Sequence, residues 1–393
     1  MDLLRLSVLA LALGHVFSNA VRTVPAMAAD VLQRDLGLSA EGLGALTGAF
    51  PAAFALAMLP VGVALDRYGV KRTALALLGV AAAGSLLGSV ATGPWSMLGA
   101  QVVLGVGCSG MLMCPITYAA KNLPPQKFGL WGGVIQAFGN TGMLLSASPL
   151  ALLVDRAGWR AGYVACALLA LGALAAVAAI VRDTQAPAQA RRTVAEDARD
   201  VVTLALSREI RGPVVIAFAS FAAVLGVRGL WGGPWLMEVK GLPRLEAGHV
   251  LLACTIALII GPAVAGLLER RFQAHRRGLL VAGHLGGAAM IVLMVLGGAL
   301  GWGVAADAVL LAGFGLLISL QVICFALVRA AVPPERVGRA LSAMNVSFFG
   351  GAAVLQAASG AAAAAGGVGA ALLVFALALV ACTLAFLRLP GPR

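Results

Sequence analysis

Charged side chains are scarce in this sequence. Asp, Glu, Lys and Arg together make up 11% of its 393 residues, whereas hydrophobic residues make up 61%. A water-soluble core cannot use so much apolar surface, which excludes an ordinary soluble protein. Apolar runs of about 20 residues, the length that crosses a bilayer as a helix, recur along the whole chain. They predict an all-α membrane protein with twelve transmembrane helices, at 6–28, 42–64, 73–93, 96–120, 129–153, 160–181, 213–238, 247–268, 278–300, 303–331, 340–362 and 367–387.

Paired cysteines and catalytic motifs are also lacking. The six cysteines all lie within apolar runs and show no paired spacing in an external loop, so no disulfide framework is predicted. The sequence has no zinc-protease helix motif, no phosphate-binding Gly-Lys loop and no serine nucleophile elbow in a credible context. We therefore expect neither an enzyme nor a bound cofactor.

Positive charge is present in excess, and its distribution is informative. The chain carries 28 Lys and Arg residues against 16 Asp and Glu, a net charge of +12. Most of the basic residues fall on segments that are cytoplasmic if the N-terminus is cytoplasmic. The excess therefore predicts both termini in the cytoplasm of a bacterial inner membrane, and it does not indicate a nucleic-acid partner. AMAAD at 26–30 is similar to a signal-peptide cleavage site, but Arg22 interrupts the preceding run, so we expect this span to be retained.

The longest polar interruption runs from 182 to 211 and divides the predicted spans six to six. It begins with an Ala- and Pro-rich piece and continues with mixed charges that are compatible with a helix. The sequence predicts an N-terminal six-helix bundle at 1–181, a cytoplasmic linker along the membrane at 182–212 and a C-terminal six-helix bundle at 213–393. The linker is either a plain tether or a regulatory segment.

The two halves of the chain contain an internal repeat. LPPQKFGLWGGVIQ at 123–136 aligns with VPPERVGRALSAMN at 332–345 at a constant shift of 209 residues (332 − 123). A nearly equal shift of 206 (228 − 22) relates Arg228 in GVRGLWGGPWL to Arg22 in NAVRTVPAMA. Two arginines therefore occupy corresponding places in the first and seventh predicted helices.

These two arginines need a physical explanation. An arginine at the centre of a membrane helix costs about 2.5 to 3.5 kcal/mol on insertion scales, and it normally faces a partner or a water-filled cavity. The functional interpretation is a binding site around Arg22 and Arg228. The structural alternative places one or both near the outer ends of their helices, where the side chains extend to the membrane interface.

The loop after the second helix carries a motif with a second, degenerate copy. GVALDRYGVKR at 62–72 combines glycines, an acidic-basic pair and further basic residues, and GLLERRF at 266–272 follows the eighth helix. Together with the six-plus-six organisation, these motifs resemble the major facilitator superfamily. The resemblance implies a secondary transporter that works by alternating access, with its substrate near the midplane. It also implies a cytoplasmic gate formed by Gly62, Asp66, Arg67, Gly69, Lys71 and Arg72 and by Glu269, Arg270 and Arg271.

The gate residues have individual physical roles in this interpretation. Gly62 is expected to allow close helix approach, Asp66 to cap a helix or bridge toward the other half, and the basic residues to hold this end at the cytoplasmic surface. The alternative is a basic cytoplasmic turn with no gating role.

The resemblance also implies which helices line the substrate cavity, namely the first, fourth, seventh and tenth, with contributions from the second, fifth, eighth and eleventh. On the first helix, His15, Asn19 and Arg22 are spaced i, i+4 and i+7 and share one face. The other polar or aromatic candidates on these helices are Tyr118, Gln136, Asn140, Arg228, Trp231, Gln321 and Asn345.

Two arginines in one cavity, with no carboxylate at similar depth, give a positive site that suits an anion. The pattern is similar to organophosphate and phosphate porters of the superfamily, and FGNTGM at 138–143 resembles the glycine-asparagine signature of nitrate and nitrite porters. We therefore expect a monomeric transporter in the lipid bilayer that takes up a small organic or inorganic anion by proton symport. His15 is the candidate proton carrier, although a lone histidine can equally serve helix packing.

Two other transport functions remain as alternatives. Export of a small metabolite or drug is disfavoured because no membrane carboxylate is present and SASPLALLVD, at 146–155, lacks the paired proline-glycine signature of drug antiporters. Copper import is the second alternative, because Cys108, Met111 and Cys114 offer soft sulfur ligands for Cu(I), although Cys and Met are also ordinary fillers of apolar contacts. A non-transporting receptor on the same fold is a further possibility.

Overall fold

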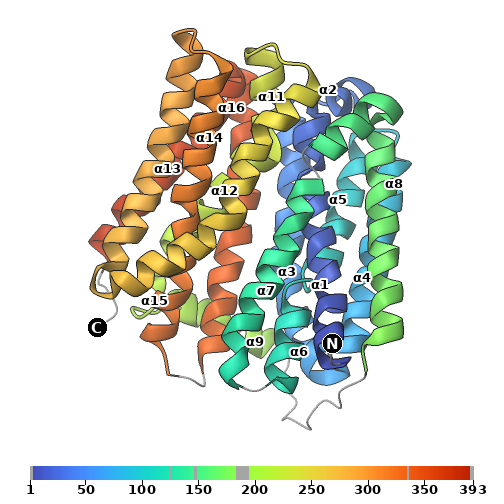
Figure 1. Ribbon diagram of the computed structural model, residues 1–393, viewed down its shortest axis with the longest axis vertical. Helices are drawn as coiled ribbons and strands as arrows, with labels where there is room; N and C mark the ends of the chain where they lie inside the picture. Colours follow the sequence, from blue (N-terminus) through green and yellow to red (C-terminus); the bar gives the residue numbers. More distant parts are fainter. Residues whose placement is uncertain (1–2, 124, 146–147, 183–193, 334–335, 390–393) are drawn as a thin grey trace.

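The structure is a computed structural model that describes residues 3–123, 125–145, 148–182, 194–333 and 336–389. Every regular element within these ranges is a helix. Helices α1 to α8 gather on one side of the molecule and α10 to α16 on the other (Figure 1). The α-helices are α1 (Leu3–Val21), α2 (Val24–Leu36), α3 (Ala40–Tyr68), α4 (Val70–Ser89), α5 (Pro94–Cys108), α6 (Met113–Asn122), α7 (Pro125–Leu145), α8 (Ser148–Ile180), α9 (Val194–Ala205), α10 (Arg211–Gly226), α11 (Gly232–Pro234), α12 (Arg244–Arg271), α13 (Arg276–Ala299), α14 (Val304–Ile318), α15 (Ile323–Ala331) and α16 (Val337–Arg388).

The predicted twelve-helix architecture is confirmed, with several spans joined or broken. Ten stretches of the described helices are long and apolar enough to cross a membrane. One of them, 339–388, has 50 residues, about 75 Å of helix, which is enough for two crossings of a bilayer core about 30 Å thick. It bends at Gly366 and Gly367, where Gly367 has a φ of +72°. The fifth span combines α7 with the start of α8, and Gly158, with a φ of +78°, separates it from the sixth.

Three boundaries differ from those that the sequence predicts. The first span does not run unbroken from 6 to 28, because α1 ends at Val21 and α2 begins at Val24. The break has a local cause, since Pro25 has no backbone N–H to bond the carbonyl oxygen of Val21, four residues earlier, but fits the first turn of a new helix. The predicted run at 129–153 covers most of α7 and the start of α8, and residues 146–147 within it lie outside the described residues. The seventh span leaves regular α-helical geometry at Val227.

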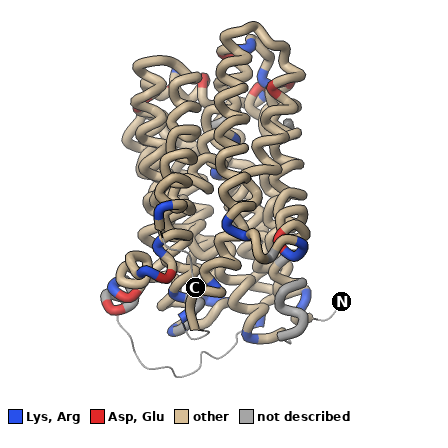
Figure 2. Tube along the Cα trace, turned by 90° about the vertical axis from the view of Figure 1, so that its left-hand side faces the viewer, with Lys and Arg blue, Asp and Glu red and all other residues tan. Residues whose placement is uncertain are grey.

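Both chain termini and α9 lie at the same end of the bundle (Figure 1). We call this the terminal end and the opposite one the far end. Lys and Arg residues concentrate at the terminal end (Figure 2). Helix α9, in the predicted linker, buries Val201 and Leu204, and its Asp200 accepts a hydrogen bond from Arg339 of α16 at 2.9 Å. The described part of the linker therefore packs against the bundle, as the mixed charge and apolar spacing suggest.

Glycines bring several helices into backbone contact. A Cβ atom on Gly44 of α3 would lie 2.5 Å from the Cα atom of Gly360 of α16, and one on Gly48 would lie 2.8 Å from the carbonyl oxygen of Ala353. A Cβ atom on Gly142 of α7 would overlap the backbone of α1 at Val16. The Gly142 contact places the polar faces of the first and fifth spans against each other.

Candidate functional site

Arg22 lies immediately after the last residue of α1, at the break in the first span. Its Nε donates to the carbonyl oxygen of Ser18 at 2.9 Å, and its Nη2 donates to the Ser18 hydroxyl at 2.7 Å. Within the described part of the chain, no acceptor is bonded to Nη1 and no carboxylate forms an ion pair with this side chain. Arg22 is half-buried, so one edge of its guanidinium is available for an anion.

The face of the Arg22 guanidinium meets aromatic rings. Its Cζ atom lies 5.7 Å from the centroid of Phe221, on α10, and 5.9 Å from that of Phe349, on α16. Phe349 in turn stacks on Phe54 with a centroid distance of 3.7 Å. Phe54 is the middle residue of the 29-residue helix α3, so these contacts place Arg22 at mid-depth in the bundle. The interfacial alternative for Arg22 is therefore disfavoured.

Arg228 occupies the corresponding break in the seventh span, but its surroundings are different. It lies in a wide π-helical turn, η1 (Val227–Trp231), that follows α10. Its Nε donates to the Thr255 hydroxyl at 2.7 Å, and its Nη2 donates to the carbonyl oxygen of Met143 at 3.3 Å. The residue is 1% exposed, and its Nη1 has no partner among the described residues. Because Met143 belongs to α7, this hydrogen bond links the two groups of helices.

The structure does not bring the two arginine side chains onto shared partners. The described contacts of Arg22 are with Ser18, Phe221 and Phe349, and those of Arg228 are with Thr255 and Met143. Their backbones adjoin, since a Cβ atom on Gly229 would lie 3.8 Å from the Arg22 carbonyl oxygen. Of the two side chains, that of Arg22 is half-buried and that of Arg228 is 1% exposed.

Four of the other predicted residues form one polar network between α1 and α7. The Asn19 amide nitrogen lies 3.4 Å from His15 Nε2 and donates to Asn140 Oδ1 at 3.5 Å. The Gln136 amide donates to the same Asn140 oxygen at 3.2 Å. His15 is buried, and its ring fills the space that a side chain at Gly139 would need. His15 and Asn19 therefore contact each other as their spacing predicts, whereas the described partners of Arg22 are other residues.

The remaining candidates are dispersed. Trp231 is buried and donates its indole N–H to Ser359 at 2.8 Å. Gln321 has a buried Oε1 with no described partner, and Asn345 is half-buried. Tyr118 packs in an apolar cluster beside Leu11 and Leu78, away from the Arg22 contacts described above.

The sulfur residues of the copper alternative do not form a shared cluster. Cys108 packs in the large hydrophobic core, whereas Met111 and Cys114 pack in a smaller apolar cluster around the first and third spans. Among the described residues, no group of three or more His, Cys, Asp or Glu side chains is placed to hold a metal ion.

The predicted gate loops lie at the terminal end, and their described contacts stay within one half each. Gly69 ends α3 with a φ of +81°, a conformation that favours glycine, and Lys71 donates to the carbonyl oxygen of Ala178 at 3.0 Å. Arg67 lies over the ring of Tyr68, Arg72 is exposed, and the Asp66 side chain is outside the described residues. A Cβ atom on Gly62 would meet nothing within 4 Å, so the close approach expected there is absent from this structure.

The second copy of the motif behaves similarly. Glu269 accepts a hydrogen bond from Arg276 at 2.5 Å, which ties α12 to α13 within the same half. Arg270 and Arg271 are exposed, and Arg271 lies over the ring of Phe272. The contacts described for Arg67, Lys71, Glu269 and Arg271 all stay within one half.

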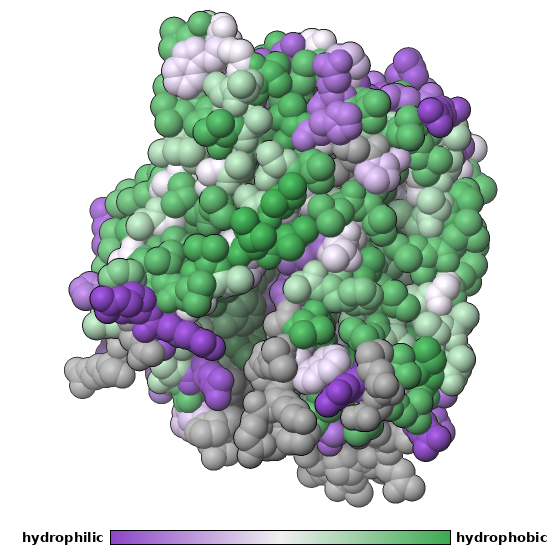
Figure 3. All heavy atoms as spheres, in the orientation of Figure 1, coloured by the Kyte–Doolittle hydropathy of each residue, from purple (hydrophilic) through white to green (hydrophobic). Residues whose placement is uncertain are grey.

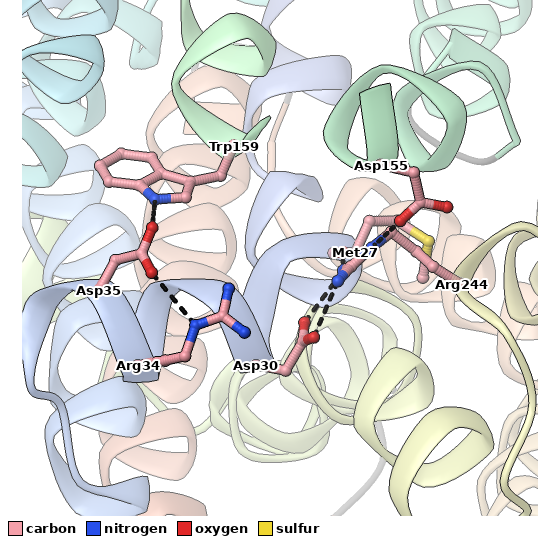
Figure 4. A network of polar contacts seen from close by, with 7 residues as sticks. All are labelled: Met27, Asp30, Arg34, Asp35, Asp155, Trp159 and Arg244. Atoms are coloured by element: carbon pink, nitrogen blue, oxygen red, sulfur yellow. Dashed lines mark hydrogen bonds and ion pairs between the residues drawn. The ribbon is translucent and has the colours of Figure 1, made fainter. Parts of the chain in front are cut away.

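An ionic cluster that the sequence analysis missed connects the halves at the far end (Figure 4). Arg244, at the start of α12, donates to Asp30 of α2 at 2.9 and 2.8 Å, to Asp155 of α8 at 2.7 Å, and to the carbonyl oxygen of Met27. The side chain of Arg244 is 10% exposed. The sequence does show that these opposite charges lie near the ends of predicted spans. Their positions along the chain do not indicate which of them contact one another.

The surface is hollowed between the two groups of helices, and the hollow opens toward the terminal end (Figure 3). The Arg244 cluster and the Gly44–Gly360 contact close the far end. The halves therefore touch at the far end and, on the face shown, are separated by the hollow nearer the terminal end.

The sequence of this bundle matches a known family of membrane proteins. The model of the Major Facilitator Superfamily matches residues 11–354. The chain belongs to this superfamily. Its architecture is that of a solved D-xylose-proton symporter, with a TM-score of 0.79, 16% identity and coverage of 100% of this chain and 99% of that chain.

Relatives within the superfamily are diverse. The chain is 28% identical over 340 residues to the tetracenomycin C resistance and export protein of Streptomyces glaucescens, covering 71% of this chain and 61% of that protein. It is 25% identical over 271 residues to the gentisate transporter of Corynebacterium glutamicum, covering 67% of this chain and 60% of that protein. The matches thus span about three fifths of the length of these relatives. Both names describe transport or export, in agreement with the expectation that the chain is not an enzyme.

Proposed function

We propose that this superfamily member carries a small organic or inorganic anion across a bacterial cytoplasmic membrane by alternating access. The observation that carries the proposal is Arg22, a half-buried guanidinium at mid-depth with one unbonded edge and no described ion-pair partner. A fixed positive charge in a low-dielectric site attracts an anion, and the planar fork suits a carboxylate, a nitrate or a phosphate. The name of the gentisate transporter supports this substrate class.

The hollow and the contacts that close the far end indicate which state of the alternating-access cycle this structure represents. If the basic terminal end faces the cytoplasm, as the charge distribution favours, both termini are cytoplasmic and the structure is open inward. The halves assigned to 1–181 and 213–393 rock against each other, and the linker at 182–212 joins them. In the outward-open state, the Arg244 cluster separates and the loops at Arg67, Lys71 and Glu269 close the cytoplasmic side. The unit that does this is a monomer in the lipid bilayer.

Proton-coupled uptake is the favoured mode. An imidazole can bind or release a proton near physiological pH, and His15 lies on the same face of the first span as Arg22. The network of Asn19, Gln136 and Asn140 offers His15 polar partners that rearrange when its protonation changes. Protonation of His15 adds a positive charge to the cavity, and binding of the anion at Arg22 adds a negative one. Each event therefore favours the other, which couples proton and anion transport.

Export is the second candidate, and one observation favours it: a resistance and export protein shares 28% identity over 340 residues. The Arg22 site serves either direction, since alternating access is reversible. The sign of the proton gradient that drives accumulation in vesicles distinguishes the two.

The test uses purified protein in detergent and in proteoliposomes. Acetate, benzoate, nitrate and phosphate are screened by thermal shift with the wild type, Arg22→Gln and the control Arg34→Gln, an exposed arginine at the far end of α2. We expect at least one anion to stabilise the wild type and the control but not Arg22→Gln, and a pH gradient to drive its uptake. No anion response in any of the three proteins, or an equal response in all, would contradict the proposal.

A further inference from the structure

We infer that the site selects anions that carry an aromatic ring, with Phe221 and Phe349 as the residues that determine this specificity. The inference rests on the proposed function and names its substrate class. The two rings beside Arg22 belong to a larger aromatic cluster. Six of the 14 phenylalanines of the chain form one continuous cluster of ring contacts. They are Phe50, Phe54, Phe221, Phe325, Phe348 and Phe349.

The cluster spans both halves of the molecule. Phe54, in α3, stacks on Phe349, in α16, with an interplanar angle of 15°. Phe221, in α10, meets Phe349 edge-on, with centroids 5.0 Å apart and planes at 61°. Stacked and edge-to-face pairs at these separations stabilise contacts beyond the burial of their area. Phe221 and Phe349 can therefore make the same kinds of ring contact with an aromatic ring of a ligand.

The position of Phe221 makes the cluster accessible from the site. Phe349 is 8% exposed, whereas Phe221 is only half-buried, as Arg22 is. Both rings lie within 6 Å of the Arg22 guanidinium, at 5.7 and 5.9 Å. A carboxylate bonded to the free edge of Arg22 thus holds any ring attached to it beside these two phenylalanines. Charge and aromatic surface are recognised together.

The rings also account for how Arg22 is held when no anion is bound. The described residues provide it with no carboxylate, and two ring faces partly replace that missing negative charge through their quadrupoles. A small hydrophilic anion pairs with Arg22 but leaves the phenylalanines without a new contact. An aromatic carboxylate gains both interactions, because its ring packs where the apolar surface is already formed.

The experiment compares two probes of equal charge and similar size. Benzoate and cyclohexanecarboxylate differ in whether the ring is aromatic, and their affinities are measured by calorimetry on the purified full chain. We expect the wild type to bind benzoate about threefold to tenfold more tightly, the range given by one aromatic pair. Phe349→Leu and Phe221→Leu should each reduce this ratio toward one while retaining carboxylate binding.

Two variants separate this inference from the proposed function. Phe314→Leu removes a buried ring that has no described contact with Arg22, and it should leave the ratio unchanged. Arg22→Gln should abolish binding of both probes. Equal affinities in the wild type, with both lost in Arg22→Gln, overturn the aromatic selectivity and leave the anion site standing. Binding of neither probe overturns the aromatic selectivity, whereas a nitrate or phosphate response in the thermal-shift screen would keep the anion site. Binding of both probes that survives Arg22→Gln overturns both proposals.

Discussion

Arg22 and Arg228 occupy equivalent places in the two halves, yet their side chains have opposite situations. Arg22 follows directly on the end of α1, and Arg228 lies two residues after the end of α10. Arg22 finds two acceptors on Ser18, four residues earlier in its own helix, and stays half-buried beside the rings. The residue four positions before Arg228 is Val224, which has no side-chain acceptor, and Arg228 extends to Thr255 and Met143 instead. Both guanidinium groups use Nε and Nη2 as donors, and the difference between them is exposure: Arg22 is half-buried, whereas Arg228 is 1% exposed.

The largest expected effect tests this difference directly. Arg22→Gln should weaken binding of the best anion from the screen by about 100-fold, because a charge-assisted pair in a desolvated site is lost. Arg22→Lys should recover part of the affinity, since an ammonium supplies the charge without the planar fork. Calorimetry measures both. Equal affinities for Arg22→Gln and the wild type would show that Arg22 is not the anion ligand.

Arg228→Ala should give the reverse result. Loss of its side chain removes two hydrogen bonds from a charged donor, to the Thr255 hydroxyl and to the Met143 carbonyl oxygen, each worth about 1.5 to 3 kcal/mol. We expect a lower melting temperature and an anion affinity within about threefold of the wild type. Thermal unfolding and calorimetry on one preparation provide both values. If Arg228→Ala instead loses binding as fully as Arg22→Gln, the two-arginine site that the sequence predicts is restored.

A third test extends the comparison to Arg244, which, like Arg228, reaches from the second half to the first. Replacing Asp30 and Asp155 together by Asn should shift the equilibrium toward an open far end by about tenfold, because charge-assisted bonds are removed from one state only. Spin labels on Trp95→Cys and Leu300→Cys, two exposed far-end positions on opposite halves, report the distance by electron paramagnetic resonance.

Asp35→Asn is the matched control for that experiment. It lies on α2, as Asp30 does, but its described partners, Trp159, Arg34 and Arg160, are all in the first half. The distance distribution should therefore stay that of the wild type. A shift as large as that of the double variant would mean that loss of any far-end carboxylate loosens the bundle.

The smallest effect concerns Asp35 itself. A hydrogen bond from the Trp159 indole, followed by Arg34 and Arg160, holds the pKa of this carboxyl below its ordinary value. A lowered pKa in the folded state gives stability that is present above the unfolded pKa of about 3.9 and is lost as pH falls through the folded value. Asp35→Asn should remove this part of the acid sensitivity, which melting curves between pH 3 and 6 would reveal as a shallower slope. An unchanged slope would contradict it.

The sequence predicted the membrane architecture because apolar run length is a direct requirement of the bilayer. It also predicted that His15 and Asn19 share a face with Arg22, since helical spacing fixes that relation. The wide turn at Val227–Trp231 has no comparable signal, and it determines where Arg228 points. The expected close approach at Gly62 failed because a glycine permits a contact but does not create one.

The aromatic cluster and the far-end seal were out of reach for a different reason. Phe54 and Phe349 are almost 300 residues apart, and only the packing of α3 on α16 stacks their rings. Arg244, Asp30 and Asp155 likewise come from three helices whose mutual placement no local pattern encodes. Repeat symmetry identified equivalent backbone positions, whereas partners across the halves depend on the tertiary fold.

The glycine contact between α3 and α16 has a consequence for the speed of a conformational cycle. Gly44 and Gly360 meet backbone to backbone, so parting them exposes almost no side-chain surface and leaves no interlocked side chains to disengage. The ionic bonds of Arg244 then contribute to the resistance to opening at that end, and dissolved salt weakens them. Turnover should consequently rise with ionic strength on the far side of the membrane. A bulkier residue at Gly44 would clash with the backbone at Gly360 and hinder closure of the far end.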